Sequence, residues 1–206
     1  CNNHGADQEA FMPRKPRIAP LEIESWSDDA RTILSRWNPP FNIHKVLAHA
    51  PKMMQAWIVF GNHILFNSLL PERERELVIL RIAWNTQCAY EWGQHAGLSK
   101  RLKIPDADIY RVPKGPRAKG WSPHESALLK ATDDLMARFE ISDPAWATLS
   151  QTYSDEQMID LVFLVGEFVL VAMALKSFRV PLDAGLEALP SGLKASGRGR
   201  RHVSAR

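Results

Sequence analysis

Hydrophobic residues recur every three or four positions along most of the chain, which is the spacing of an amphipathic helix. No segment alternates between polar and apolar residues like a half-buried strand, and no Asn-Gly pair signals a hairpin. The pattern therefore predicts an all-α fold. The clearest example is a helix predicted over residues 51–69, whose apolar stripe consists of Met54, Trp57, Ile58, Gly61 and Leu65.

Serine and proline residues predict where several helices begin and end. Residues 122–125 (SPHE) and 154–157 (SDEQ) each place a serine at the N-cap and an acid or amide three residues later, which is a capping box. The second capping box opens a long helix predicted to run to about Phe178. A short helix over residues 21–37 should stop before the double proline that follows it, and another should begin at Asp143.

The segment 72–95 (ERERELVILRIAWNTQCAYEWGQH) carries the most information in the chain. Residues 72–84 are apolar on nearly every side after an acidic start, which predicts a central buried helix. The polar triplet 85–87 interrupts the pattern, and a second helix is predicted to start near Cys88. A connection this short lets the two helices pack against each other.

The length of 206 residues suits one domain, and 45% hydrophobic with 24% charged residues is typical of a soluble globular protein. We expect a polar arm over residues 1–20, a single all-α domain over residues 21–190 and a basic, disordered tail over residues 191–206. Subtracting the tail's five positive charges from the net charge of +3 leaves −2 for the remainder. No basic or aromatic stripe accompanies the tail, so nucleic acid is not an expected partner.

The longest apolar run, residues 158–175, contains Asp160 and Glu167. It is too short and too polar to span a bilayer, so no membrane partner is expected. Cys1 and Cys88 do not form a disulfide framework, and Cys88 lies inside a helical pattern. This cysteine usage favours a reducing compartment and predicts a cytoplasmic protein.

Three chemically active side chains, Cys88, Glu91 and His95, occupy relative positions 0, +3 and +7, so a helix places them on one face. Cys88 falls near the helix N-terminus, where backbone N–H groups favour a thiolate. Glu76 lies on the preceding helix and is predicted to meet this face. A buried, unpaired carboxyl has a raised pKa, which suits a general acid or base, so all four residues are catalytic candidates.

Each candidate also has a purely structural interpretation. Cysteine is among the most buried residue types, so Cys88 alternatively only packs in the core. Glu91 and His95 also have the spacing of an ordinary surface pair, and Glu76 also stabilises its own helix N-terminus. No metal site is expected, because one helix without a second histidine nearby supplies too few ligands.

Four further residues are candidates for substrate binding. Trp57, Trp84 and Tyr90 either line an apolar pocket or only pack. Glu167 lies in the apolar run of the long C-terminal helix, where an unpaired charge is costly. It therefore either forms an ion pair with Arg81 on the central helix or lines the pocket.

The segment 72–95 resembles the core motif of the carboxymuconolactone decarboxylase family, which includes the alkyl hydroperoxidase D type proteins. This resemblance implies an alkyl hydroperoxidase D-like bundle of about six to eight helices around a buried site, assembled as a homotrimer or homohexamer. It covers about residues 45–187 and continues through residues 121–122 (WS), 141–143 (ISD), 153–157 (YSDEQ) and 180–183 (VPLD).

The hydroperoxidase branch of the family carries a Glu followed by Cys-x-x-Cys-x-x-x-His. Glu76, Cys88 and His95 match this pattern, whereas Glu91 replaces the second cysteine and Tyr90 replaces a histidine between the two cysteines. Without the dithiol, the usual peroxide-reducing cycle through an internal disulfide is not possible. A peroxidase would depend on Cys88 and an external thiol.

The decarboxylase branch implies a lyase without a cofactor that acts on a small carboxylated lactone or another intermediate of aromatic-compound breakdown. In this interpretation Glu91 is the acid/base, His95 holds or relays the proton and Glu76 orients His95. Two alternatives stay open. One is a thiol peroxidase centred on Cys88, and the other is a non-catalytic ligand-binding protein in which these residues only pack.

Overall fold

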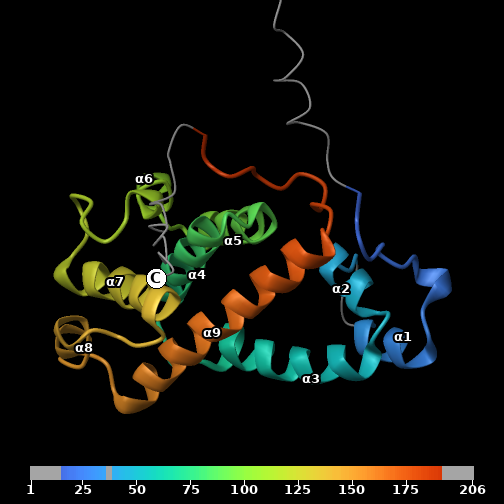
Figure 1. Cartoon of the computed structure of the whole chain (residues 1–206), viewed down its shortest axis with the longest axis horizontal. Helices are drawn as coiled ribbons and strands as arrows, with labels where there is room; N and C mark the ends of the chain where they lie inside the picture. The colour runs from blue at the N-terminus through green and yellow to red at the C-terminus, as the bar shows by residue number, and fades with distance from the viewer. Residues whose placement is uncertain (1–14, 36–38, 192–206) are drawn as a thin grey trace, which may run out of the picture.

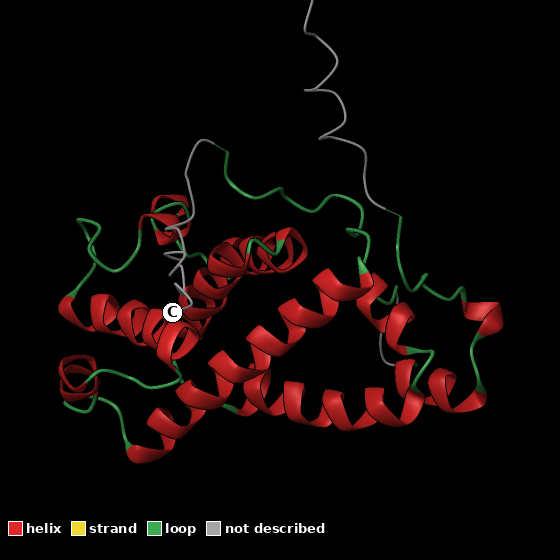
Figure 2. Ribbon diagram, in the orientation of Figure 1, coloured by secondary structure: helices red, strands yellow, loops and turns green. Residues whose placement is uncertain are grey.

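The computed structural model describes residues 15–35 and 39–191, and these ranges contain nine α-helices and no strand (Figure 2). The prediction of an all-α fold is therefore confirmed. Two helices beyond the predicted set, α2 and α6, are six and four residues long, too short to produce a periodic pattern. The α-helices are α1 (Asp28–Leu34), α2 (Asn42–Leu47), α3 (Pro51–Asn62), α4 (Glu72–Thr86), α5 (Ala89–Arg101), α6 (Asp106–Ile109), α7 (Pro123–Arg138), α8 (Asp143–Leu149) and α9 (Asp155–Phe178).

Helix α4 occupies the centre of the fold and packs against α5, α7 and α9. Every residue from Arg75 to Trp84 is buried, which confirms the predicted central helix. Gln87 then adopts a left-handed backbone conformation with φ 53° and ψ 44°, and Cys88 is the N-cap of α5. This tight connection lays α5 directly against α4.

Helix α9 runs diagonally across the molecule, and α3 lies along its lower edge in the view of Figure 1. Both predicted capping boxes are present, at Ser122 for α7 and at Ser154 for α9. Each serine side chain accepts a hydrogen bond from the backbone N–H three residues later, and the side chain of that later residue accepts one from the serine's own backbone N–H. Helix α9 ends at Phe178, as predicted.

The helix predicted over residues 51–69 is interrupted in the structure. Helix α3 ends at Asn62, and a π-helical turn, η3 (His63–Asn67), follows it. A π turn changes the direction of the side chains that it carries. Leu65 and Phe66 of η3 line the cavity described below, and apolar spacing alone does not distinguish this turn from a continuous helix.

The N-terminal part of the chain is less helical than predicted. Over residues 21–35 only a 3₁₀ turn, η2 (Ile23–Ser25), and α1 form, and residues 36–38 lie outside the described ranges. Residues 1–14 and 192–206 also lie outside them. The predictions of an extended arm and of a disordered tail therefore stay predictions.

Among the described residues, α9 is the one helix long and apolar enough to cross a membrane by length and composition, so the prediction that residues 158–175 are too short and too polar is wrong on these two criteria. Half of its most apolar window is buried inside the protein, and the core helix of a soluble protein has the same properties. Its two buried acids are also engaged. Asp160 accepts a hydrogen bond from the Leu69 backbone N–H at 2.8 Å, and Glu167 accepts one from Trp57.

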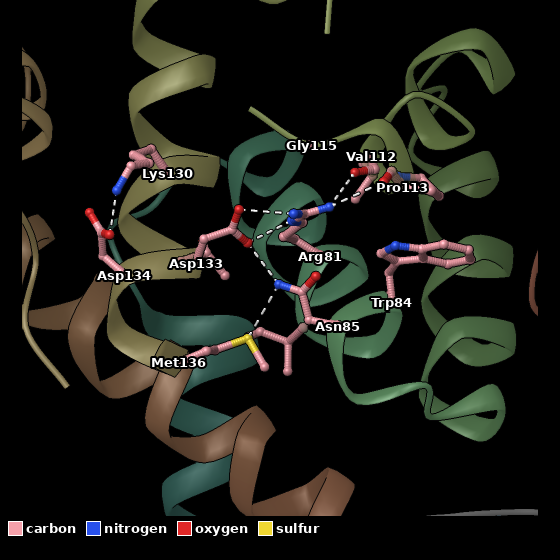
Figure 3. A network of polar contacts seen from close by, with 12 residues as sticks. Arg81, Trp84, Asn85, Val112, Pro113, Gly115, Lys130, Asp133, Asp134 and Met136 are labelled. Atoms are coloured by element: carbon pink, nitrogen blue, oxygen red, sulfur yellow. Dashed lines mark hydrogen bonds and ion pairs between the residues drawn. The ribbon is translucent and has the colours of Figure 1, made fainter. Parts of the chain in front are cut away.

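The Arg81 guanidinium forms a polar network with α7 and the loop before it (Figure 3). Its Nε and Nη2 atoms donate to the two Asp133 carboxylate oxygens at 2.7 and 2.8 Å, and Nη1 donates to the Val112 carbonyl at 3.0 Å. Asn85 donates to the same carboxylate at 2.7 Å. The predicted alternative of an Arg81–Glu167 ion pair is therefore wrong, because Asp133 already satisfies the arginine.

Replacing Asp133 with Asn should lower the free energy of unfolding by about 2 kcal/mol, because it removes a charged partner of a buried guanidinium. Urea unfolding of the variant measures this loss. Glu140→Gln is the matched control, since Glu140 is exposed. An unchanged unfolding midpoint for Asp133→Asn would contradict the structural role of the network.

Large apolar side chains are exposed along α3, η3 and α9. Exposed apolar surface of this kind often marks an interaction site. The homotrimer or homohexamer stays a prediction. The exposed apolar side chains on these three elements are Met53, Val59, Phe60, Phe66, Ile159, Val162, Phe163, Leu170 and Met173.

Candidate functional site

A cavity of about 330 Å³ lies between α2, α3, η3, α5 and α9. Its wall is mainly apolar, which is usual for a site that binds a small organic molecule. Helix α5 contributes Glu91 and His95, α3 contributes Trp57, and α9 contributes Glu167. With Tyr90, also of α5, the structure thus brings together at one cavity five of the candidate site residues from the sequence.

Glu91 lies in the first turn of α5 and is only 2% exposed. Neither carboxyl oxygen has a hydrogen-bond partner among the described residues. Burial raises the pKa of this carboxyl well above its ordinary value of 4.5, and the nearby Glu167 raises it further. The helix N-terminus favours the charged form by only about 1 kcal/mol, whereas burying an unpaired carboxylate costs several. Glu91 therefore retains its proton to higher pH than an exposed glutamate.

The imidazole of His95 is held by Glu76 from the neighbouring helix. His95 Nδ1 lies 2.8 Å from Glu76 Oε2, and Glu76 is completely buried. With the Nδ1 proton donated to this carboxylate, the other ring nitrogen, Nε2, is left for the cavity. The ring also makes an edge contact with Phe168, with centroids 5.0 Å apart. Glu76 therefore contacts the face of α5 that carries His95, as the sequence predicted.

Glu167 lines the cavity from α9 and accepts a hydrogen bond from Trp57 Nε1 at 2.6 Å. Burial raises the pKa of Glu167, and the Trp57 hydrogen bond partly opposes this shift. Gly61 of α3 lies beside this carboxyl, and a Cβ there would make an ordinary contact with Glu167 Oε1 at 3.7 Å. Of the two predicted alternatives for Glu167, the structure supports the cavity wall.

Tyr90 also lines the cavity, but its hydroxyl is engaged in a network behind it. It donates to Asp183 and accepts from the Ile43 backbone N–H at 3.3 Å. Burial raises the pKa of Tyr90, and the hydrogen bond to Asp183 raises it further. Gln94 donates to the same carboxylate at 2.8 Å. Tyr90 is thus a fixed wall of the cavity with little freedom to donate its proton to a ligand.

Asp183 and His44 are among the residues at the site that the sequence analysis did not identify. Asp183 joins the loop after α9 to α2 and α5, and its place in the VPLD segment was the available signal. His44 lines the cavity, and its ring packs near Trp57 with centroids 6.3 Å apart. Burial lowers the pKa of His44 to about 4, with a smaller opposing effect from Asp183. His44 lies on the short helix α2, and no sequence pattern distinguishes it from a histidine on the surface.

The structure places Cys88 and Trp84 away from the cavity wall. Cys88 is 2% exposed and packs with apolar residues of α2 and α9. Burial raises the pKa of its thiol to about 12, and Glu91 adds to the shift. The expectation of a thiolate at this helix N-terminus is therefore wrong, because desolvation outweighs the helix dipole.

Trp84 is also fully buried, in a cluster with Trp92 whose ring centroid lies 6.4 Å away, beside the Arg81 network (Figure 3). A substrate-binding role for Trp84 finds no support in this position. Across residues 15–35 and 39–191, no group of three histidine, cysteine or acidic side chains is arranged to hold a metal ion.

Residues 51–134 match the model of the Carboxymuconolactone decarboxylase family. This match confirms the family resemblance, and it includes Glu76, Cys88, Glu91 and His95. The matched stretch is 84 of the chain's 206 residues, and it carries α3, α4, α5 and α6 and most of α7. No curated protein matches the chain significantly by sequence.

Solved structures show the same fold. The alkylhydroperoxidase AhpD core, an uncharacterized peroxidase-related protein from Ralstonia eutropha JMP134, superposes with a TM-score of 0.71 at 18% identity, covering 82% of this chain and 93% of that one. An uncharacterized peroxidase-related protein from Silicibacter sp. TM1040 gives 0.71 at 17%, covering 84% and 94%. A variant of the debrominase Bmp8 in complex with 2,3,4-tribromopyrrole gives 0.66 at 11%, covering 84% and 95%. The alkyl hydroperoxidase D-like fold is therefore confirmed.

Proposed function

We propose that this protein is an acid/base enzyme of the decarboxylase type, acting without a cofactor on a small carboxylated lactone or a related intermediate. The observation that carries the proposal is the Glu91 carboxyl, which lies at the cavity wall with a raised pKa and without a hydrogen-bond partner among the described residues. A carboxylic acid kept neutral by an apolar site is able to deliver its proton to a bound molecule.

In the proposed reaction, the bond between the substrate and its carboxylate breaks and CO₂ leaves. The electron pair of that bond moves into the neighbouring unsaturated system, and Glu91 protonates the carbon that receives it. The product therefore lacks the carboxylate, has a shifted double bond and carries one new hydrogen on the carbon that received the electron pair, and Glu91 is left ionised. Water restores the proton after release of the product.

His95 is the residue proposed to assist this proton transfer. Glu76 fixes the ring through Nδ1, and Nε2 is available to hydrogen-bond the substrate or relay a proton to Glu91. Glu76 itself does not line the cavity. It is therefore a positioning residue for His95, whereas Glu91 and His95 are the proposed catalytic residues.

The direct experiment supplies the protein with a panel of carboxylated unsaturated lactones in D₂O. We expect release of CO₂ together with one solvent deuteron on carbon in the product. A saturated analogue of each lactone is the control, because it offers no unsaturated system to receive the electron pair. Absence of CO₂ release across the panel would contradict the lyase proposal.

The pH dependence follows from the raised pKa of Glu91. The active form of a general acid is protonated, so kcat should be highest at low pH and fall as pH rises through the Glu91 pKa. The midpoint of this fall should lie well above 4.5, the ordinary value for glutamate. A rate that rises through this range would instead indicate Glu91 acting as a base.

A peroxidase centred on Cys88 receives less support. Burial raises the pKa of the Cys88 thiol to about 12, so little of the reactive thiolate forms at neutral pH. In a Cys1→Ser background, Cys88 should react with an organic hydroperoxide no faster than a free thiol, and Cys88→Ala should keep the decarboxylase rate. Fast oxidation of Cys88 together with loss of thiol-dependent peroxide turnover in Cys88→Ala would favour the peroxidase.

A further inference from the structure

A buried arginine lies behind the pair of His95 and Glu76 and has no part in the reaction proposed above. Arg75 precedes Glu76 on α4, and only 6% of its surface is exposed. Arginine is almost never buried to this extent unless its charge is paired. Within residues 15–35 and 39–191, Glu76 is the one acidic residue that forms an ion pair with the Arg75 guanidinium.

Two buried atoms of opposite charge face each other in this ion pair. Glu76 Oε1 and Arg75 Nε each lack a hydrogen-bond partner among the described residues, and they lie 3.6 Å apart. The other carboxylate oxygen, Glu76 Oε2, lies 2.8 Å from His95 Nδ1. Because Glu76 is completely buried, its negative charge needs a nearby cation, and Arg75 supplies one.

The contact between Arg75 and Glu76 does not follow from helical spacing. Consecutive side chains on a helix point in different directions, so these two would ordinarily not meet. Glu76 points toward α5, where it contacts His95, and the long Arg75 side chain reaches the same carboxylate. Neither Arg75 nor Glu76 lines the cavity, whereas His95 does. The three side chains therefore form a series of contacts that leads from the interior to the cavity wall.

The charge of Glu76 determines which ring nitrogen of His95 carries the proton. A carboxylate only accepts hydrogen bonds, so it holds the proton on Nδ1 and leaves Nε2 as an acceptor. A protonated carboxyl would instead donate to Nδ1, and the ring proton would then lie on Nε2. A cation beside Glu76 favours the first arrangement, because opposite charges attract most strongly where water is excluded.

We propose that Arg75 is a positioning residue, whose guanidinium compensates the buried Glu76 carboxylate so that the carboxylate fixes the tautomer of His95. The tautomer is a property of the free protein. Only its consequence for turnover rests on the proposed function, in which Nε2 of His95 assists the proton transfer.

The test records the ring nitrogens of His95 by nitrogen-15 NMR near neutral pH, with His95→Gln to assign the signals. In the parent protein we expect a proton on Nδ1 and none on Nε2. In Arg75→Met the ring proton should move to Nε2, and Glu76 should take up one proton from the solvent and donate it to Nδ1. Arg75→Lys should keep the parent pattern, because it restores the positive charge. The parent pattern in a folded Arg75→Met would overturn the proposal.

Arg73→Met is the matched control. Arg73 lies two residues earlier on the same helix and pairs with carboxylates other than Glu76. Its replacement should leave the His95 signals unchanged. If Arg73→Met shifted these signals as much as Arg75→Met, the cause would be a general disturbance of α4, and the proposal would be wrong.

A double-mutant cycle keeps the test decisive even where Arg75→Met does not fold by itself. Urea unfolding compares the effect of Arg75→Met in the parent protein and in a Glu76→Gln background, which has no carboxylate charge to compensate. The loss of stability in the parent should be largely absent in that background. Equal losses, or failure to fold in both, would contradict a role through Glu76. Absence of decarboxylase activity would overturn the proposed function and leave these results standing.

Discussion

Replacing Glu91 with Gln should lower kcat by about 10²- to 10⁴-fold, the usual contribution of a positioned general acid. Glutamine has nearly the shape of a protonated glutamate and fills the same buried position in the first turn of α5. It has no acidic proton to give to the substrate carbon. The rate of CO₂ release at saturating substrate measures the loss, and substrate affinity should change much less than kcat.

The same substitution should not weaken the fold. Because the Glu91 pKa is raised in the folded protein, the folded state binds more protons than the unfolded state above pH 4.5, so stability falls as pH rises. Glu91→Gln removes this dependence and should be the more stable protein at neutral pH. Glu140→Gln, an exposed control, should change neither rate nor stability. Near-parental kcat in a folded Glu91→Gln would exclude Glu91 as the acid.

Replacing His95 with Gln should lower kcat by a comparable factor, about 10²- to 10⁴-fold. The substitution removes the ring nitrogen that faces the cavity, and Glu76 loses its histidine partner. The free energy of unfolding should fall by about 1–3 kcal/mol, because a buried carboxylate loses a hydrogen bond. Turnover must therefore be measured per folded molecule, at a temperature well below the unfolding transition.

His124 offers a matched control for His95, since it also contacts a glutamate, Glu74, and an aromatic ring, Tyr153. It does not line the cavity. His124→Gln should affect stability without a specific loss of kcat. If both histidine variants lose turnover equally, the effect of His95→Gln is on the fold rather than on the proton transfer.

The sequence predicted the fold wherever local chemistry determines it. The capping serines Ser122 and Ser154 mark helix starts through hydrogen bonds to their own helices, so the structure matched them. The apolar run of α4 predicted a helix buried on all sides, because apolar side chains on every face must avoid water, and the structure shows this burial. The π turn over His63–Asn67 contacts α9, and no local sequence pattern records such a tertiary contact.

The candidate site divides in the same way. Helical spacing placed Glu91 and His95 on one face, and the short 85–87 connection brought Glu76 to it. The predicted partner of Arg81 was wrong. Its actual partner, Asp133, lies 52 residues away in the sequence, and spacing alone does not favour Asp133 over the other acidic residues. The thiol of Cys88 was misjudged because burial, which sets its pKa, is a tertiary property.

The most direct test of the central claim is the titration of the Glu91 carboxyl by NMR, with carbon-13 in the glutamate side chains and Glu91→Gln to assign the signal. We predict a midpoint well above 4.5, with the acid still protonated when the exposed glutamates are ionised. A midpoint at or below 4.5 would mean that Glu91 is a carboxylate at working pH, and would contradict its role as the proton donor.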